Sequence, residues 1–447
     1  MRLQSTSLDD LDRAIAECER SDYIYMYPPR QAYRPFGRED DVVNAYKIRS
    51  LRKHPVNVYV HIPFCRQICA FCNLYATTVR SSVMHDRYVI ALRAQVRELA
   101  NLMDQTTQVP TVYLGGGTPT ALPISDLIGL AEAIRSLLPG VTSATEFALE
   151  ADPQTVDDSS LRLLADAGYR RISYGFQSKQ ASEIRGIGRR TEPSVQDESV
   201  IRALEAGFQN VCVDLIYGLP AQTVSSWASS VQQCIDLGPQ TICCYPLTLR
   251  PHTGFGRTLL HGAIGRGSYD LWHRADTLLQ EAGYARETHV RWSLPGGGYL
   301  QKQLHWGMQN LVGLGAGARS YLWHLDIRYG YSVTRRVEPL RLYLASSEAG
   351  EPQAIDGFQM DDDERLRKAV TLGLFQLDRM HVTALTGLDP WVVFAREFTG
   401  LVDRGLAYSD EKTFTLTEAG VPYRDLIAQL FFSDRVKELV QTHSYDE

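Results

Sequence analysis

No part of the 447-residue sequence approaches the roughly 18 to 20 uninterrupted apolar residues that a membrane-spanning helix requires. Residues 1–20 are polar and charged and lack the apolar core of a secretion signal. An excess of positive charge is also missing, since 46 lysines and arginines face 52 acidic residues and the formal net charge is -6. This balance argues against a nucleic-acid surface driven by bulk charge. We therefore expect a cytoplasmic protein with no nucleic-acid and no membrane partner.

A disulfide framework is not indicated either, although the chain contains 8 cysteines. Such frameworks are typical of short secreted domains, and this chain is long and shows no secretion signal. Only Cys65, Cys69 and Cys72 lie close together with regular spacing. The remaining cysteines are expected to be buried or incidental thiols: Cys18, Cys212, Cys234, Cys243 and Cys244.

From residue 56 onward, short apolar segments alternate with amphipathic stretches. The apolar segments cover residues 56–62, 111–114, 146–150, 171–176, 210–216 and 240–247. Strands that alternate with helices in this way predict parallel βαβ units. We therefore expect an α/β fold in which a partial (β/α)6 barrel places its ligand site at the carboxyl ends of the strands.

Four parts of the chain can be distinguished. Residues 1–54 predict a helix and a tyrosine- and proline-rich arm that covers the site, and residues 55–260 predict the barrel. Residues 261–350 predict a barrel extension that contributes to the ligand region, and residues 351–447 a mainly helical, winged-helix-like module. Acidic residues at 361–364 weaken a DNA-binding interpretation of this module. We therefore expect it to be structural or to cover the substrate.

The most specific signal is the segment from Cys65 to Cys72, whose spacing is C-x3-C-x2-C directly after the first predicted strand. Thiolates are soft ligands that suit zinc or iron–sulfur clusters. A structural zinc site would need a fourth Cys or His nearby, and the nearest candidate, His85, lies in a predicted helix. Three ligands around a cubane cluster leave one iron open for chemistry.

The segment Tyr59-Val-His-Ile-Pro-Phe-Cys65, with this spacing, resembles radical S-adenosylmethionine (SAM) enzymes. The resemblance is to their oxygen-independent coproporphyrinogen oxidase-like branch and runs over residues 55–330. It implies a [4Fe–4S] cluster on Cys65, Cys69 and Cys72 that reduces SAM and releases methionine and a 5′-deoxyadenosyl radical. It also implies an external electron donor such as flavodoxin or ferredoxin.

The same resemblance implies the SAM contacts, most of which follow the ends of predicted strands. They are Tyr59, Phe71, Gly116, Gly117, Thr118, Glu150, Gln177, Arg189, Asp214 and Gly315. Gly116, Gly117 and Thr118 match the family's segment that holds the SAM amino group. The fork of Arg189 suits the SAM carboxylate, and Asp214 matches an acid that contacts the ribose or adenosine. A second SAM is expected near residues 240–249 and 313–319.

Three functions compete within this branch. The first is a class C methylase or cyclopropanase that transfers a methyl or methylene group to an sp² carbon of a specialised metabolite, free or linked to a carrier or peptide. The second is an oxygen-independent coproporphyrinogen III oxidase or other anaerobic tetrapyrrole chemistry, and the third is a haem-binding chaperone. We predict the first, because the arm lacks the decarboxylase's Arg-Tyr-Thr-Ser-Tyr-Pro pattern and Trp306 replaces a polar residue. The chaperone usually lacks a long N-terminal arm.

The substrate-side candidates lie in the arm and after the barrel. The predicted catalytic residues are Tyr27, Tyr33, Glu287 and His289, and Arg30 is a further candidate for substrate contact. A histidine with a pKa near neutral can remove a proton after methylene transfer. An ordinary packing role is an equal alternative for each of these side chains. We expect the protein to be a monomer.

Overall fold

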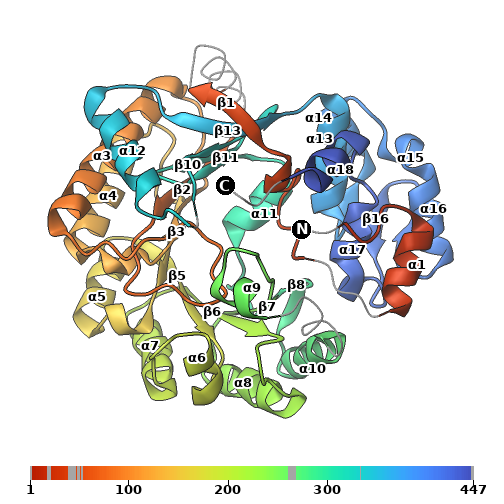
Figure 1. Ribbon diagram of the computed structural model, residues 1–447, viewed down its shortest axis with the longest axis horizontal. Helices are drawn as coiled ribbons and strands as arrows, with labels where there is room; N and C mark the ends of the chain where they lie inside the picture. Colours follow the sequence, from red (N-terminus) through yellow and green to blue (C-terminus); the bar gives the residue numbers. More distant parts are fainter. Residues whose placement is uncertain are drawn as a thin grey trace.

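The computed structural model of the chain describes residues 3–17, 22–38, 47, 51, 54–259, 268–332 and 334–443. Figure 1 shows strands that curve around the centre of the molecule, with helices outside them and a smaller, mainly helical region at one side. Cys18 and residues 260–267 of the predicted barrel extension lie outside the described residues. The division of the chain at residues 54, 260 and 350 stays a prediction.

The centre of the fold is a run of parallel strands that follow one another along the chain. They are β2 (Val56–Ile62), β3 (Thr111–Gly116), β4 (Glu146–Ala151), β5 (Tyr169–Gln177), β6 (Asn210–Tyr217) and β7 (Thr241–Pro246). Their residues are almost all buried, as expected for strands that helices cover on one face and that enclose an interior on the other. The six predicted strands are therefore present, with ends that differ by a few residues.

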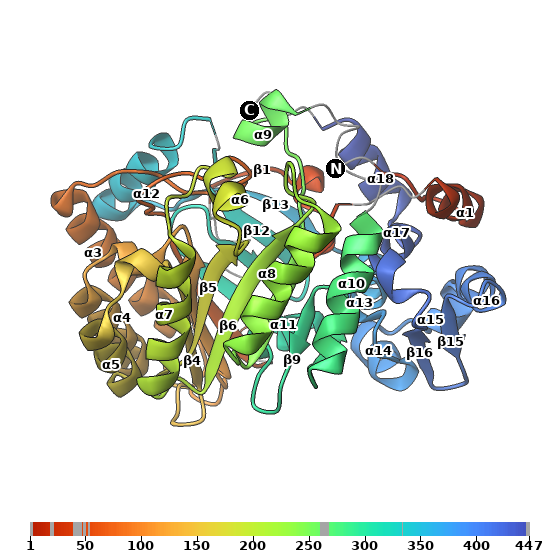
Figure 2. The ribbon, with the colours of Figure 1, turned by 90° about the horizontal axis from the view of Figure 1, so that it is seen from below.

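Helices connect these strands and cover their outer face, as Figure 2 shows for α4, α5, α7 and α8. Those between the strands are α3 (Ser82–Leu102), α4 (Ile124–Leu137), α5 (Asp158–Asp166), α6 (Ala181–Gly186), α7 (Pro193–Glu205) and α8 (Val224–Asp236). After β7, α10 (Ser268–Glu281) packs against α8, and the short helix α9 (Gly254–Thr258) lies beyond the carboxyl ends of the strands (Figure 2). Capping boxes begin two of them, with Asp157 and Ser160 at α5 and Thr223 and Ser226 at α8. This arrangement confirms the predicted α/β fold with a partial (β/α)6 barrel.

Further strands extend both edges of this sheet without closing it, so that 13 strands form one sheet. Beyond β2 lie β10 (Asn310–Leu314), β11 (Arg319–Tyr321), β12 (Leu325–Tyr329), β13 (Ala354–Gln359) and β1 (Arg34–Arg38). Beyond β7 lie β9 (Arg291–Ser293) and β8 (Ala285–Thr288). The helix α11 (Leu300–Trp306) contacts β2, β3 and the C-terminal helix α13, so it lies at the open side between the two edges.

The C-terminal region combines helices with a small three-stranded sheet. Its elements are α13 (Asp362–Gly373), β14 (Leu377–Asp378), α14 (Arg379–Thr386), α15 (Pro390–Val393), α16 (Ala395–Asp403), β15 (Ala407–Ser409), β16 (Thr413–Leu416), α17 (Arg424–Gln429) and α18 (Asp434–Gln441). The helix α12 (Glu338–Ala349) precedes it, and α1 (Leu8–Ala16) packs against α16. Among the described residues no helix is long and apolar enough to cross a membrane.

The N-terminal arm, residues 22–38, links the barrel to the C-terminal region. The backbone N–H of Ile24 donates to Asp425 over 3.1 Å, and Arg424 donates to the carbonyl of Ile24. One residue further, the carbonyl of Tyr25 accepts from Lys302 at 2.9 Å and from Trp306 at 3.2 Å, both on α11. The arm is therefore held by α17 on one side and by α11 on the other.

Candidate active site

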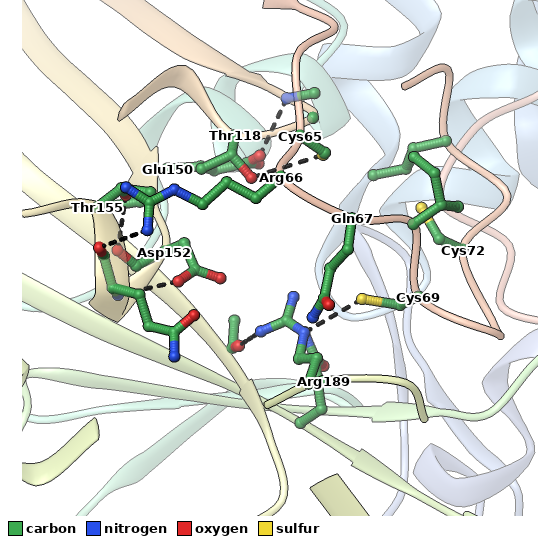
Figure 3. A pocket seen from close by; sticks show the side chains of 18 of the residues that line it. Cys65, Arg66, Gln67, Cys69, Cys72, Thr118, Glu150, Asp152, Thr155 and Arg189 are labelled. Atoms are coloured by element: carbon green, nitrogen blue, oxygen red, sulfur yellow. Dashed lines mark hydrogen bonds between the residues drawn. The ribbon is translucent and has the colours of Figure 1, made fainter. Parts of the chain in front are cut away.

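A cavity of about 300 Å³ opens at the carboxyl ends of the parallel strands. We call it the cysteine cavity, because Cys65, Cys69 and Cys72 line it together with residues from the ends of β3, β4, β5 and β6. Consecutive parallel strands end at the same edge of the sheet, so side chains more than 140 residues apart in sequence meet here. Figure 3 shows the cysteine loop on one side of the cavity and the strand ends on the other.

The three cysteines lie on the loop between β2 and α3 and are partly exposed. Backbone hydrogen bonds fix this loop, from Cys65 N–H to the carbonyl of Thr77 at 2.9 Å and from Cys72 N–H to that of Cys69 at 3.1 Å. Burial raises the pKa of the Cys65 thiol to about 12, and the neighbouring cysteines raise it further against a lowering contact from Thr118. Burial raises the pKa of the Cys72 thiol as well, so these two thiols favour the protonated form without a metal, and a bound metal must displace their protons.

This donor set fits an iron–sulfur cluster better than a closed zinc site. In the described parts of the chain, no histidine and no fourth cysteine lines the cavity. A structural zinc site normally has four protein ligands. The guanidinium of Arg189 donates to the Sγ of Cys69 over 3.2 Å, and hydrogen bonds to cysteine sulfur tune cluster potentials. Cys65, Cys69 and Cys72 would hold three irons of a [4Fe–4S] cluster and leave the fourth open.

The glycine segment after β3 packs too closely against its neighbours for any side chain. Gly116 has a φ of 115°, and a Cβ there would lie 2.5 Å from the ring of His61. A Cβ on Gly117 would lie 2.7 Å from the carbonyl oxygen of Phe64. The N–H of Gly116 donates to the carboxylate of Glu150 over 3.0 Å. The segment thus presents backbone groups to the cavity and positions Glu150 at the end of β4.

Three carboxyl groups line the cysteine cavity, Glu150, Asp152 and Asp214, and burial shifts the pKa of the first and the last. Burial raises the pKa of Glu150 to about 7, and Asp214 adds to this rise against hydrogen bonds from Gly116 and Tyr113. Burial also raises the pKa of Asp214, whose carboxylate accepts from the hydroxyl of Ser173 over 3.1 Å. A cationic ligand in this cavity would favour the ionised form of both acids.

Gln177 and Arg189 complete this side of the cavity. The pairing of β5 with β6 shifts register between Gly175 and Gln177, and Gln177 has a φ of 69°. Such a bulge redirects the side chains at the end of a strand. Arg189 donates to the carbonyl of Gly175 as well as to Cys69, so one guanidinium joins the strand end to the cysteine loop. Phe71 and Thr118 also line the cavity, which brings most of the predicted SAM contacts together.

A second cavity of about 200 Å³ adjoins the first, and Leu74 lines both. We call it the tyrosine chamber, because its walls carry Tyr25, Tyr59, Tyr75, Tyr299, Tyr321 and Tyr331. Two basic side chains, Lys302 and Arg319, and the buried His305 also line it. Among the described residues, no carboxylate contributes to the lining of this chamber. It differs in this from the cysteine cavity, whose described lining combines arginines with three carboxyl groups.

Sequence reasoning missed Lys302, His305 and Arg319, although it placed the region of residues 313–319 near the site. Arg319 is at the start of β11, which reaches the barrel only because β10 pairs parallel with β2. Lys302 and His305 are three positions apart on α11, a spacing that places both on one face of a helix. This spacing was the one signal in the sequence that could have found them.

None of the four predicted catalytic residues, Tyr27, Tyr33, Glu287 and His289, lines either cavity. The hydroxyl of Tyr27 donates to Glu364, and Tyr33 is buried in the core. Glu287 is paired with Arg291 over 2.6 Å, and His289 is hydrogen-bonded to Asp425 over 3.0 Å. Tyr27 and His289 thus join the arm and the barrel to the C-terminal region, whereas the contacts of Glu287 lie within residues 287–303. Their catalytic role stays a prediction, because none of these side chains lines either cavity.

Three further predicted residues lie around the chamber rather than in the cysteine cavity. Tyr59 is part of its wall, and Arg30 donates to the hydroxyl of Tyr331 over 2.7 Å at its edge. Gly315 lies behind the chamber, with a φ of 98° and an N–H that donates to Gln95 over 2.8 Å. Gly315 therefore lies in a tight turn, and its role as a SAM contact stays a prediction.

A pair of thiols that the sequence did not connect lies inside the barrel. Cys212 on β6 and Cys243 on β7 are fully buried, and their sulfur atoms are 3.9 Å apart. The Sγ of Cys212 is 3.8 Å from the carboxylate of Asp214. Their 31-residue separation hides the pair in the sequence, because the register of two neighbouring parallel strands alone brings them together.

Comparisons with known proteins agree with this geometry. Residues 59–234 match the radical SAM superfamily. The chain is 30% identical to the haem chaperone HemW of Escherichia coli over 280 residues, which cover 61% of this chain and 72% of HemW. It is 26% identical to the oxygen-independent coproporphyrinogen III oxidase of Pseudomonas aeruginosa, over 84% of this chain and 85% of that protein. The structure of the coproporphyrinogen III oxidase HemN of Escherichia coli superimposes with a TM-score of 0.79, at 23% identity over 94% of this chain and 98% of HemN.

The chain therefore belongs to the radical SAM superfamily, in the branch that contains HemW and the oxygen-independent coproporphyrinogen III oxidases. Its cofactors are accordingly a [4Fe–4S] cluster and SAM, which the cysteine cavity fits. The prediction of a class C methylase or cyclopropanase in specialised metabolism is wrong, because the relatives found are haem-related proteins. That prediction gave weight to local departures in the arm and at Trp306, whereas the similarity extends over most of the chain.

Proposed function

We propose that this protein is a radical SAM enzyme that acts on a carboxylated tetrapyrrole such as coproporphyrinogen III. The observation that carries the proposal is the tyrosine chamber, which adjoins the cysteine cavity and contains two basic side chains but no carboxylate among its described lining residues. A tetrapyrrole with carboxylate side chains offers flat rings for the tyrosines and negative charge for the cations. The similarity to a coproporphyrinogen III oxidase over most of the chain supports this substrate class.

The bound cluster and SAM supply a one-electron reductive cleavage of SAM, which initiates hydrogen abstraction from the substrate. The residues of the chain contribute orientation and charge. Arg189 would bind the SAM carboxylate, and the acids Glu150 and Asp214 would face its positive charge and its ribose. The aromatic walls of the chamber would exclude water beside the reacting groups. An external one-electron donor such as flavodoxin or ferredoxin would reduce the cluster. The protein would act as a monomer.

The second candidate function is haem binding by a chaperone. His305 favours it, because this buried side chain lines the chamber and neither of its ring nitrogens has a hydrogen-bond partner. A neutral imidazole is a common ligand of haem iron. The similarity to HemW of Escherichia coli supports this candidate. The arm favours the enzyme instead, since it contributes Tyr25 to the chamber and narrows it.

One anaerobic experiment separates the two candidates. Cluster-reconstituted protein is incubated with SAM, dithionite and coproporphyrinogen III, and 5′-deoxyadenosine and the tetrapyrrole are measured by mass spectrometry. The enzyme proposal expects 5′-deoxyadenosine formation that depends on the substrate, together with loss of carbon dioxide and two hydrogens from a side chain. One hydrogen atom passes to the 5′-deoxyadenosyl radical and the other leaves as a proton, and the remaining electron passes to a one-electron acceptor that is added to the assay after SAM cleavage has begun. Unchanged coproporphyrinogen, slow SAM cleavage and a stoichiometric Soret band with added haem would contradict it and support the chaperone.

A further inference from the structure

Within the described parts of the chain, Lys302 and Arg319 of the tyrosine chamber form no ion pair with a carboxylate, although buried cations normally have such a partner. Lys302 donates to the carbonyl of Tyr25 over 2.9 Å, and Arg319 donates to the hydroxyl of Tyr25 and to the sulfur of Met26. These partners are neutral. Burial lowers the pKa of Lys302 far below its ordinary value, and the charges of Arg291, Arg424 and Arg319 lower it further. An anion in the chamber would relieve this desolvated, repelling charge.

A second and independent observation also indicates a missing ligand. His305 is only 3% exposed, and neither of its ring nitrogens has a hydrogen-bond partner among the described residues. Its ring centroid lies 4.5 Å from that of Tyr321. Burial and the charges of Lys302 and Lys368 lower its pKa, so the imidazole is neutral and offers one donor and one acceptor. Buried polar groups without partners are rare in folded proteins. A polar ligand in the chamber would supply the partner that His305 lacks.

The chamber walls suit a flat ring. Tyr59 and Tyr113 stack at 19° with ring centroids 6.2 Å apart, and Tyr113 and Tyr299 stack at 27° with centroids 5.1 Å apart. Tyr59 and Tyr299 face the chamber, while Tyr113 donates to Glu150 at the edge of the cysteine cavity over 3.2 Å. An aromatic stack therefore leads from the chamber to the SAM side, so a ring in the chamber would lie next to the site of hydrogen abstraction.

The same chamber is poorly suited to a second SAM molecule. SAM has a sulfonium and an ammonium group, and both would meet Lys302 and Arg319 without a nearby acid. The cysteine cavity, in contrast, provides Glu150 and Asp214. Among the described lining residues, the cysteine cavity alone thus offers acids to a cationic cofactor, whereas the chamber offers cations without acids.

We propose that Lys302 and Arg319 form the subsite that binds a carboxylate side chain of the substrate, with His305 as a hydrogen-bonding partner of the same ligand. This inference rests on the proposed tetrapyrrole function and assigns its charge recognition to named side chains. Arg319 presents a planar fork to one carboxylate, and Lys302 adds a point charge from α11. The carboxylate would replace the hydroxyl of Tyr25 as the partner of Arg319.

The test uses the cluster-loaded full chain under anaerobic conditions and coproporphyrin III, the stable fluorescent tetracarboxylate, as the probe. Fluorescence quenching gives its Kd for the wild type and for Lys302→Met, Arg319→Gln and Arg319→Lys. Removal of either charge is expected to weaken binding by about tenfold to a hundredfold, the effect of one charge-assisted hydrogen bond. Arg319→Lys is expected to lose less affinity for coproporphyrin III, because the substitution keeps the positive charge. Iron content and circular dichroism verify that each variant is folded.

Two controls make the result specific. Lys412→Met removes an exposed cation of the C-terminal region and is expected to leave the Kd unchanged. The tetramethyl ester of coproporphyrin III lacks carboxylates and is expected to bind wild type and Lys302→Met equally.

The outcomes separate this inference from the function on which it rests. Turnover of coproporphyrinogen III by the wild type, with equal Kd values for wild type and chamber variants, would overturn the subsite and leave the function standing. Neither turnover nor coproporphyrin binding by the wild type would overturn both. Equilibrium dialysis that gives two SAM molecules per wild-type chain and one per Lys302→Met chain would assign the chamber to SAM and overturn the subsite.

Discussion

The two adjoining cavities are built from the chain in different ways. The cysteine cavity takes its residues from successive βα units, so each new strand end adds one or two side chains to the same edge. The tyrosine chamber takes Tyr25 from the arm, Tyr59 from β2 and Arg319 from β11, which are far apart in the sequence. Their charges also differ, because the first combines acids with arginines, whereas the described lining of the second has cations and no acid. On the proposed function, the first cavity holds the cofactors common to the superfamily and the second binds the substrate.

Loss of one cluster ligand should have the largest effect. In Cys69→Ala the cluster has only two protein ligands, and we expect 5′-deoxyadenosine formation to fall by at least about a thousandfold, because the chemistry depends on the cluster. Iron and sulfide analysis and mass spectrometry measure this loss. Cys234→Ala is the matched control, since Cys234 is buried in α8 away from both cavities and should retain full iron content. Equal iron content in both variants would refute the assignment.

The glycine segment should be nearly as sensitive, although it contributes no side chain. Gly116→Ala places a Cβ 2.5 Å from the ring of His61, so the segment must shift and SAM affinity should fall by about a hundredfold. Gly207 has a φ of 90°, but a Cβ added there would meet no neighbour within 4 Å, so Gly207→Ala tests strain without a clash. We expect it to cost about 1 kcal/mol of stability and to leave SAM affinity unchanged. Equilibrium dialysis with labelled SAM distinguishes the two variants.

The acid of the cysteine cavity should make SAM binding depend on pH. The pKa of Glu150 is raised to about 7 by burial, so its carboxylate forms as the pH rises through 7 and then attracts the cationic SAM. We expect SAM affinity to rise about tenfold between pH 6 and pH 8 in the wild type and to stay flat in Glu150→Gln. Glu146→Gln is the control, because Glu146 lies at the other end of β4, also with a raised pKa, and lines neither cavity. A pH profile of Glu150→Gln that matches the wild type would contradict this role.

The raised pKa of Glu150 also predicts that the ligand-free protein loses stability as the pH rises, although SAM affinity increases. A carboxyl group with a folded pKa above its unfolded value binds more protons in the folded state between pH 4.5 and about 7. The free energy of unfolding of the ligand-free protein should therefore fall by roughly 2 to 3 kcal/mol across this range, and less in Glu150→Gln. Urea unfolding at pH 5 and pH 8 measures the difference.

The smallest expected effect concerns the clamp on the arm. Asp425 accepts hydrogen bonds from the N–H of Ile24 and from Arg424, and it is hydrogen-bonded to His289. Burial alone would raise the pKa of Asp425, but His289 and Arg424 hold it below the ordinary value. Asp425→Asn should loosen the arm, weaken coproporphyrin III binding by a factor of about three to ten, and leave SAM affinity unchanged. Parallel titrations with both ligands test this. Equal losses for both ligands would show that the two cavities are not independent.

How much of each cavity could be predicted from the sequence depends on whether local patterns or long-range strand pairing form it. The strands, the glycine segment and the cysteine loop depend on local patterns, so the barrel was predicted from the sequence. The chamber depends on the pairing of β10 with β2 and on the path of the arm, which no local pattern encodes. Likewise, Cys212 and Cys243 meet only through strand register. The reaction subclass was mispredicted for the same reason, since it depends on a few side chains whose spatial neighbours are not visible in the sequence.

The clamp between Ile24 and α17 also links the two ends of the chain thermodynamically. Ile24 and Arg424 are 400 positions apart, yet their contact fixes the residue that precedes the chamber's Tyr25. A ligand that binds more tightly when Tyr25 is displaced must also favour opening of the hydrogen bonds between Ile24 and α17, because such coupling is reciprocal. Amide hydrogen exchange in residues 424–429 would then report on occupancy of a chamber formed mainly by the barrel and the arm.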